Sequence, residues 1–141
     1  MKAAVYYGTH DVRIEEVENP RPTSGEVLLR VTRSGMCGTD ASEWKAGPLI
    51  FPLLKEHPVS GFKGPMILGH EFIGEIIEVS PDVTAFAVGD RVASGAGISC
   101  GECPRCAEGR TNLCQKYTTH GLNRHGGMAE MVAVPASTLV A

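Results

Sequence analysis

The alternation of hydrophobic and polar positions along the chain predicts short β-strands. Residues 2–7 are rich in β-forming side chains, and residues 11–15 alternate apolar and polar side chains with a period of two. The same alternation returns over residues 26–32, after a segment at 20–25 whose two prolines and one glycine break the pattern. Three strands are therefore expected in the first 32 residues.

Later segments predict further strands. Residues 70–79 are expected to form a largely buried strand that begins at a His-Glu pair. A Gly-Asp turn precedes a short strand over residues 91–93, and residues 128–134 form the last clear strand pattern. These segments bring the number of expected strands to six.

Helical signals are sparse by comparison. Residues 39–45 predict one short helix, with Thr39 or Asp40 as its N-cap. Four prolines and three glycines between residues 47 and 66 indicate a long loop. Many short strands with few short helices favour a mainly β fold, a partly open β-barrel, over a doubly wound α/β sheet.

Composition narrows the class of protein. The 141 residues suffice for one domain with a core, and 43% hydrophobic with 21% charged residues is typical of a globular protein. A formal net charge of −3 gives no reason to expect nucleic acid or an anionic membrane as a partner. The chain has no apolar run of transmembrane length and no signal-peptide pattern at its start. Together with free thiols at metal-ligand spacing, these features predict a cytoplasmic protein.

The strongest chemical signal is a cluster of cysteines. Four of the five cysteines fall within fifteen residues, as Cys100-x2-Cys103-x2-Cys106-x7-Cys114. Four thiolates from one short lobe, residues 97–116, suit either a closed zinc site or an iron–sulfur cluster. The bacterial ferredoxin spacing has its fourth cysteine after three residues, followed by proline, whereas here seven residues intervene and Gln115 follows. Structural zinc is favoured, and reduced cysteines without a metal are the remaining alternative.

A second group of candidate ligands is scattered along the chain. Cys37 and His70 each stand at the expected end or start of a strand, and a catalytic zinc needs three protein ligands and an open position. Glu71 would lie behind or beside such a metal, and Asp40 is suited to hold the His70 ring in one tautomer. A single cysteine or histidine is more often a packed core residue, so the residue types alone do not decide whether a metal binds here.

Four motifs in order give the chain a family resemblance: Cys37-Gly38-Thr39-Asp40, Gly69-His70-Glu71, Gly89-Asp90-Arg91-Val92 and the four-cysteine lobe. Over essentially all of residues 1–141 the chain resembles the catalytic domain of zinc-dependent medium-chain alcohol dehydrogenases. The butanediol, sorbitol and threonine dehydrogenases are the most similar branch. The resemblance implies a GroES-like β-barrel with a zinc-binding lobe.

The resemblance also implies roles for individual residues. Cys37 and His70 would bind a catalytic zinc, and Glu71 would be a neighbouring or exchangeable ligand. Thr39 would pass a proton from the substrate hydroxyl, and the four lobe cysteines would bind a structural zinc. The implied activity is hydride transfer between a small-molecule alcohol or diol and NAD or NADP, in a homodimeric or homotetrameric parent protein.

Two departures from the family pattern affect these expectations. Many relatives have a histidine two residues after the aspartate, where this chain has Ser42, which cannot act as a base near neutral pH. The chain also ends at Ala141, before the family's third zinc ligand and its nucleotide-binding Rossmann domain. We therefore expect residues 1–141 to be inactive by themselves.

Other functions and residues carry less weight. An iron–sulfur electron-transfer protein and a zinc-stabilised binding module without catalysis are the competing functions. Trp44 is expected in the core or at a pocket rim, and His57, His120 and His125 are expected to be solvated.

Overall fold

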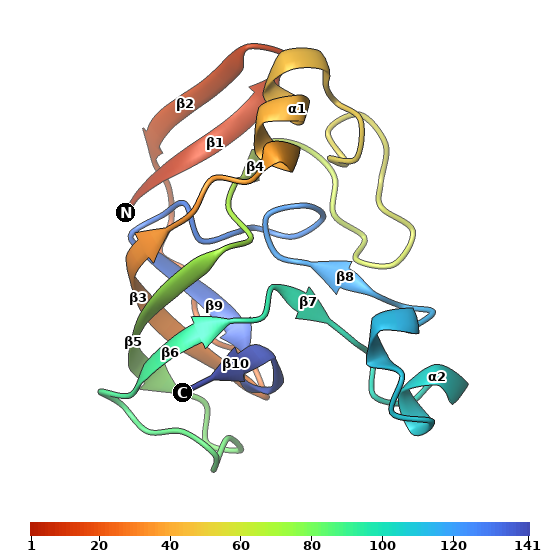
Figure 1. Cartoon of the computed structure of the whole chain (residues 1–141). Helices are drawn as coiled ribbons and strands as arrows, with labels where there is room; N and C mark the ends of the chain where they lie inside the picture. The colour runs from red at the N-terminus through yellow and green to blue at the C-terminus, as the bar shows by residue number, and fades with distance from the viewer.

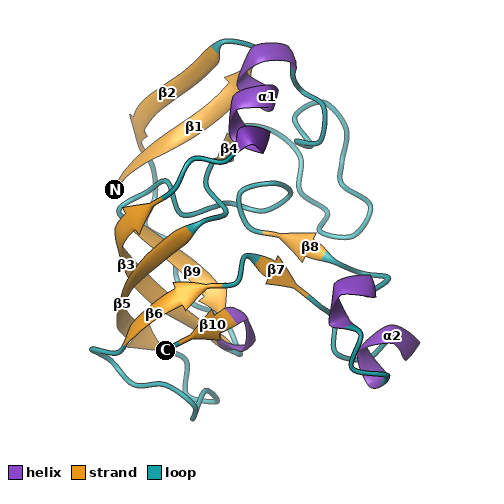
Figure 2. Cartoon of the chain, in the orientation of Figure 1, coloured by secondary structure: helices purple, strands orange, loops and turns teal.

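Antiparallel pairing between strands that are distant in sequence organises the chain. The computed structural model describes residues 1–141, and five strands form a curved sheet in the order β10-β6-β5-β3-β9. These strands are β3 (Glu26–Ser34), β5 (Phe72–Val79), β6 (Arg91–Ser94), β9 (Met131–Pro135) and β10 (Leu139–Val140). β3 lies between β5 and β9 and pairs with both (Figures 1 and 2).

A second sheet and a cysteine lobe flank the curved sheet. The second sheet has the order β2-β1-β4, with β1 (Lys2–Gly8), β2 (Asp11–Glu16) and β4 (Met66–Ile67). A two-stranded ribbon of β7 (Gly97–Ile98) and β8 (Thr118–Thr119) leads to the lobe, which projects from the rest of the domain (Figure 1). The lobe contains α2 (Pro104–Ala107) and the 3₁₀ turn η1 (Thr111–Leu113), and a second turn, η2 (Ala136–Thr138), precedes β10.

The main core lies on one face of the curved sheet. Leu29 of β3 is fully buried and stands opposite Ile76 of β5 on one side and Val132 of β9 on the other. Alternate side chains of neighbouring strands point to the same face, so this register brings their apolar positions together. The buried cluster comprises Val27, Leu29, Phe72, Ile76, Val92, Val132, Val134 and Leu139. The period-two pattern of β3 therefore supplies the centre of the core.

Helix α1 (Gly38–Ala46) follows β3 and is anchored by buried polar groups. The Tyr6 hydroxyl of β1 donates to the main-chain carbonyl of Glu43, and the N–H of His10 donates to that of Trp44. The Glu43 carboxylate is 1% exposed and accepts backbone N–H groups of the following loop, from Leu49, Ile50 and Phe51. A buried carboxylate is tolerated when its lone pairs are satisfied in this way. The helix is thereby fixed between β1 and the loop.

The structure confirms the mainly β fold and adjusts several predicted boundaries. The six expected strands are present, but the β5 strand begins at Phe72, after the His-Glu pair, and its burial alternates along the strand. The helix begins at Gly38 with Cys37 as its N-cap, so the prediction of Thr39 or Asp40 was wrong. Asp40 instead caps from the third helical position, because its carboxylate accepts the Cys37 N–H. The four remaining strands are two-residue pairings with weak sequence signals, and no helix combines the length and apolar character needed to cross a membrane.

Substitution of a core residue in β5 tests the register of the curved sheet. Ile76→Ala is expected to lower the free energy of unfolding by about 2–5 kcal/mol, because the side chain is fully buried and its loss leaves a cavity. The matched control is Ile73→Ala on the same strand. Because the Ile73 side chain is 42% exposed, this substitution should lower the free energy of unfolding by about 1 kcal/mol or less. Chemical denaturation followed by circular dichroism measures both. Equal losses would contradict the assigned register.

Candidate metal centres

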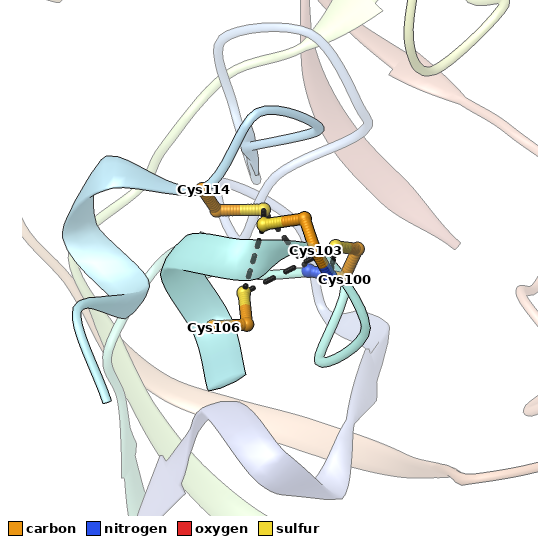
Figure 3. A group of neighbouring side chains, drawn as sticks. All are labelled: Cys100, Cys103, Cys106 and Cys114. Carbon is orange, nitrogen blue, oxygen red and sulfur yellow. Dashed lines mark hydrogen bonds between the residues drawn. The ribbon is translucent and has the colours of Figure 1, made fainter. Parts of the chain in front are cut away.

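The four lobe cysteines converge on one point, as their spacing predicted. Cys100 precedes α2, Cys103 is its N-cap, Cys106 lies within it and Cys114 follows η1. Their sulfur atoms all lie within 4.8 Å of one another and face a common centre (Figure 3). None of them is paired in a disulfide. The chain therefore supplies four free thiols to a single cage.

The sulfur separations fit one metal ion. The Sγ atoms of Cys103 and Cys106 are 3.6 Å apart, and the Cys100–Cys106 and Cys103–Cys114 pairs are each separated by 4.0 Å. Four Zn–S bonds of about 2.3 Å at tetrahedral angles put sulfurs about 3.8 Å apart. A multi-iron cluster inserts irons and sulfides between the cysteine sulfurs and needs a wider cage. The donor set and its dimensions therefore fit zinc better than an iron–sulfur cluster.

Backbone N–H groups of the lobe donate hydrogen bonds to cysteine sulfurs and so favour their thiolate form. The Cys114 sulfur accepts the N–H groups of Cys100 and Lys116, at 3.2 and 3.3 Å. Hydrogen bonds from the N–H groups of Gln115 and Cys106 lower the pKa of Cys103 to about 6, whereas burial raises the pKa of Cys106 to about 11. Metal ligands are thiolates rather than thiols. These backbone N–H groups therefore favour the thiolate form of Cys103, which is the form that binds a metal.

The second candidate group is assembled where β3 and β5 meet. Ser34 at the end of β3 pairs with Phe72 at the start of β5, and Cys37 follows one strand while His70 and Glu71 precede the other. Because the strands are antiparallel, those flanking residues lie at the same edge of the sheet. Ligand atoms of Cys37, His70 and Glu71 all lie within 4.8 Å of one another. The fold thus brings together three residues that are far apart in the sequence.

Asp40 connects two members of this group. Its Oδ2 atom accepts the Cys37 N–H at 2.9 Å, and its Oδ1 atom is 3.9 Å from Nδ1 of His70. The carboxylate and the imidazole are 4% and 13% exposed, and the two facing atoms are buried without a hydrogen-bond partner. A buried carboxylate beside a histidine orients the ring and favours binding of a cation by its other nitrogen. Asp40 thus lies between the Cys37 backbone and the His70 ring, and its role as a support of the histidine stays a prediction.

Thr39 also lies at this group, and Ser42 does not. The Thr39 Oγ1 atom is 3.7 Å from the Cys37 sulfur, and the residue is half-buried in the first turn of α1. Ser42 is exposed on the next turn. A hydroxyl can both donate and accept a hydrogen bond, so the role of Thr39 as a proton relay stays a prediction.

Open space adjoins the group. A cavity of about 640 Å³ lies against His70 and Glu71 and is walled by the ends of β3, β5 and β6. An apolar cavity of about 360 Å³ lies between α1 and β1 and is lined in part by Met36 and Trp44. Trp44 is 47% exposed and contacts His10, which agrees with a position at a pocket rim. A small molecule could therefore reach the histidine and glutamate from solvent.

One histidine outside the site, His120, differs from the sequence expectation. His120 is 3% exposed, and its Nδ1 atom is 3.0 Å from the carbonyl of His125, so the prediction that it is solvated was wrong. Burial lowers the pKa of His120, which keeps the ring neutral. The Nδ1 atom of His125 accepts the Ile67 N–H, so its ring is tied to β4. His120 is therefore a buried packing residue of the 120–126 turn, whereas His125 is exposed, as predicted.

Sequence reasoning missed two residues of this region. Gly35 lies between β3 and Cys37, and its N–H donates to the Glu71 carbonyl at 2.7 Å. Glu43 holds the loop after α1 through its buried carboxylate. A glycine after a strand and an acidic residue in a short helix are common, so only the strand pairing and the burial distinguish them.

Comparison with known proteins extends these observations. Residues 23–141 match the family described as the alcohol dehydrogenase GroES-like domain. The chain is 39% identical over 123 residues to L-threonine 3-dehydrogenase from Paraburkholderia phytofirmans, an alignment that covers 87% of this chain and 34% of that protein. The chain therefore spans about a third of the length of the curated relatives it matches.

Solved structures give the same result at the level of the fold. The crystal structure of 2R,3R-butanediol dehydrogenase from Bacillus subtilis matches with a TM-score of 0.88 and 35% identity, over 99% of this chain and 39% of that one. A putative zinc-binding dehydrogenase from Sinorhizobium meliloti bound to NADP matches with a TM-score of 0.81 and 34% identity, over 99% of this chain and 37% of that one. With the family match over most of its length, this chain belongs to the alcohol dehydrogenase GroES-like domain family.

Proposed function

We propose that residues 1–141 form the catalytic domain of a zinc-dependent, NAD(P)-linked alcohol or polyol dehydrogenase. The observation that carries the proposal is the group of Cys37, His70 and Glu71 beside an open cavity, with Asp40 behind the histidine. The family match and the dehydrogenase names of the relatives support the reaction class. In this proposal a separate Rossmann domain of a longer protein, absent from residues 1–141, holds the nicotinamide.

The donors present suit a catalytic zinc. A thiolate sulfur, an imidazole nitrogen and a carboxylate oxygen are the three ligand types that zinc accepts in proteins, and the proposed ligands here are Cys37, His70 and Glu71. The unpartnered Nδ1 of His70 faces Asp40, which leaves Nε2 for the cation. Zinc held there would supply Lewis acidity for polarising a substrate hydroxyl, and a nicotinamide would supply the acceptor for hydride.

The chain's own residues orient the site and move the proton. Asp40 holds the backbone N–H of Cys37 and faces the His70 ring, so one carboxylate fixes two ligands. The Thr39 hydroxyl accepts the proton that leaves the substrate oxygen and passes it on. Ser42 is exposed and cannot store that proton, so in this proposal the relay continues through water.

The lobe has a different proposed role. A four-thiolate zinc site is closed, because all four coordination positions are filled by protein. Its metal would stabilise the fold of residues 97–116 and take no part in the reaction. Neither α2 nor η1 contains a buried residue, so in this proposal the metal would replace packing that these two elements lack.

The substrate, the location and the assembly complete the proposal. A secondary alcohol or vicinal diol is the proposed substrate, supported by the diol in the name of the Bacillus subtilis relative. NADP in the Sinorhizobium meliloti structure supports a nicotinamide cofactor. Five free cysteines support a reducing compartment, the cytoplasm. Assembly of the parent into a homodimer or homotetramer stays a prediction.

Substitution of one cysteine in each centre tests the division of labour. Cys103→Ser should lower the free energy of unfolding by more than about 3 kcal/mol, because structural zinc sites contribute most of the folding energy of small lobes. Cys37→Ser should cost about 1 kcal/mol or less, since it leaves the lobe intact. Thermal unfolding and zinc content by atomic emission measure both. Equal destabilisation by the two variants would refute the proposed roles.

Colour and turnover test the proposed reaction against electron transfer. The purified protein should be colourless and contain zinc, whereas an iron–sulfur protein would be brown and absorb visible light. In the full-length protein, Cys37→Ser should reduce alcohol-dependent formation of NAD(P)H by at least about 10²-fold, because the polarising metal is lost. Residues 1–141 alone should form none. A brown iron-containing protein without dehydrogenase activity would establish the competing function.

Neutralisation of Asp40 tests its support of the histidine. Asp40→Asn keeps an oxygen for the Cys37 N–H but removes the charge that faces His70, so zinc affinity at this centre should fall by about 10- to 100-fold. The control is Glu75→Gln in β5, which removes a carboxylate that forms an exposed ion pair with Arg30. This variant should leave the zinc affinity unchanged. Competition with a chromophoric chelator measures the affinity. An unchanged affinity in Asp40→Asn would show that the carboxylate does not support the ligand.

A further inference from the structure

The Glu71 carboxylate occupies the place that a side chain at position 35 would fill. A Cβ atom added to Gly35 would lie 2.5 Å from Oε2 of Glu71 and 3.2 Å from its Cβ. Both separations are shorter than ordinary contacts between such atoms. The glutamate can therefore fold over the backbone of residue 35 only while that residue is glycine.

This position of the carboxylate is what brings it to the candidate metal centre. Glu71 lies just before β5 and is exposed, so no core packing directs its side chain. Its main-chain carbonyl accepts the Gly35 N–H at 2.7 Å and the Ser34 hydroxyl at 3.3 Å, which fixes the backbone from which the side chain extends. From there the carboxylate passes over Gly35 to lie within 4.8 Å of the Cys37 sulfur and the His70 ring.

The backbone of residue 35 does not itself require glycine. Nine glycines of the chain have a positive φ, and Gly35 is not among them. An alanine could therefore take up the same backbone conformation without strain. The contact with Glu71 is the remaining reason for a residue without a side chain here.

We propose that Gly35 is a positioning residue of the metal centre, which acts by leaving room for Glu71 to serve as a ligand beside Cys37 and His70. The inference rests on the proposed function, because it assumes that a divalent metal binds this group. An alanine at position 35 would displace the flexible, exposed end of Glu71 rather than the paired strands. The effect therefore falls on metal binding and only weakly on the fold.

A titration with Co²⁺ tests this role, because cobalt substitutes for zinc and its visible spectrum reports the ligand set. The protein, with zinc already in the cysteine lobe, is titrated as wild type, Gly35→Ala, Glu71→Ala and the double variant. We expect Gly35→Ala and Glu71→Ala to weaken Co²⁺ binding by the same factor, about 10- to 100-fold, and to change the spectrum in the same way. The double variant should bind no more weakly than Glu71→Ala alone.

Gly38→Ala is the matched control. Gly38 directly follows Cys37, whereas Gly35 precedes it by two residues; Gly38 also has no positive φ, and an added Cβ there meets nothing within 4 Å. Its affinity and spectrum should equal those of the wild type. A loss in Gly38→Ala as large as that in Gly35→Ala would overturn the inference, because any change beside Cys37 would then suffice.

The remaining outcomes separate this inference from the proposed function. A wild-type protein that takes up no second Co²⁺ would overturn the metal centre itself. Uptake by the wild type with an unchanged Gly35→Ala variant, or a further loss in the double variant, would overturn the role of Gly35 alone. If Gly35→Ala folds poorly, thermal unfolding without added Co²⁺ still tests the contact. The double variant, which lacks the Glu71 carboxylate, should then be more stable than Gly35→Ala. A double variant that stays as unstable as Gly35→Ala would refute the contact.

Discussion

The antiparallel pairing of β3 with β5 is the constraint on which the rest of the site depends. It sets the end of one strand beside the start of the other, so Cys37 meets His70 and Glu71 at one edge of the sheet. The same pairing carries the core, because Leu29 and Ile76 face each other within it. A single-residue slip would exchange buried and exposed faces and also separate the candidate ligands. Stability and chemistry therefore share one register.

Helix α1 adds charge and orientation to that edge. Its two buried residues are both acidic, and each is used: Asp40 turns back to Cys37 and His70, and Glu43 turns outward to the loop at 49–51. The helix therefore connects the strand end to the loop through polar contacts and does not pack by an apolar face. Burial of an unpaired carboxylate is unfavourable, so the N–H groups that donate to Oδ2 of Asp40 and to Glu43 explain why such a short helix is held in one orientation.

The two candidate metal centres follow opposite designs. The lobe draws its four candidate ligands from fifteen consecutive residues, and backbone N–H groups donate to the Cys114 sulfur. The second centre draws its residues from two strand ends and a helix, and an open cavity adjoins it. A site built from local sequence stabilises its own segment, whereas a site built across a fold can be opened to a substrate. This difference in construction underlies the different roles proposed for them.

The sequence by itself determined the strands with strong alternation, the lobe and the family. Local spacing decides whether four thiols can meet, so the lobe could be recognised from the intervals between Cys100 and Cys114 alone, and the ordered motifs around Cys37 and His70 identified the family. Only the tertiary structure decided which residues support those ligands. The N-cap at Cys37, the burial of His120 and the contact between Gly35 and Glu71 all depend on which strand lies beside which. Periodicity reports the face of a strand but not its neighbour, and these contacts are made between neighbours.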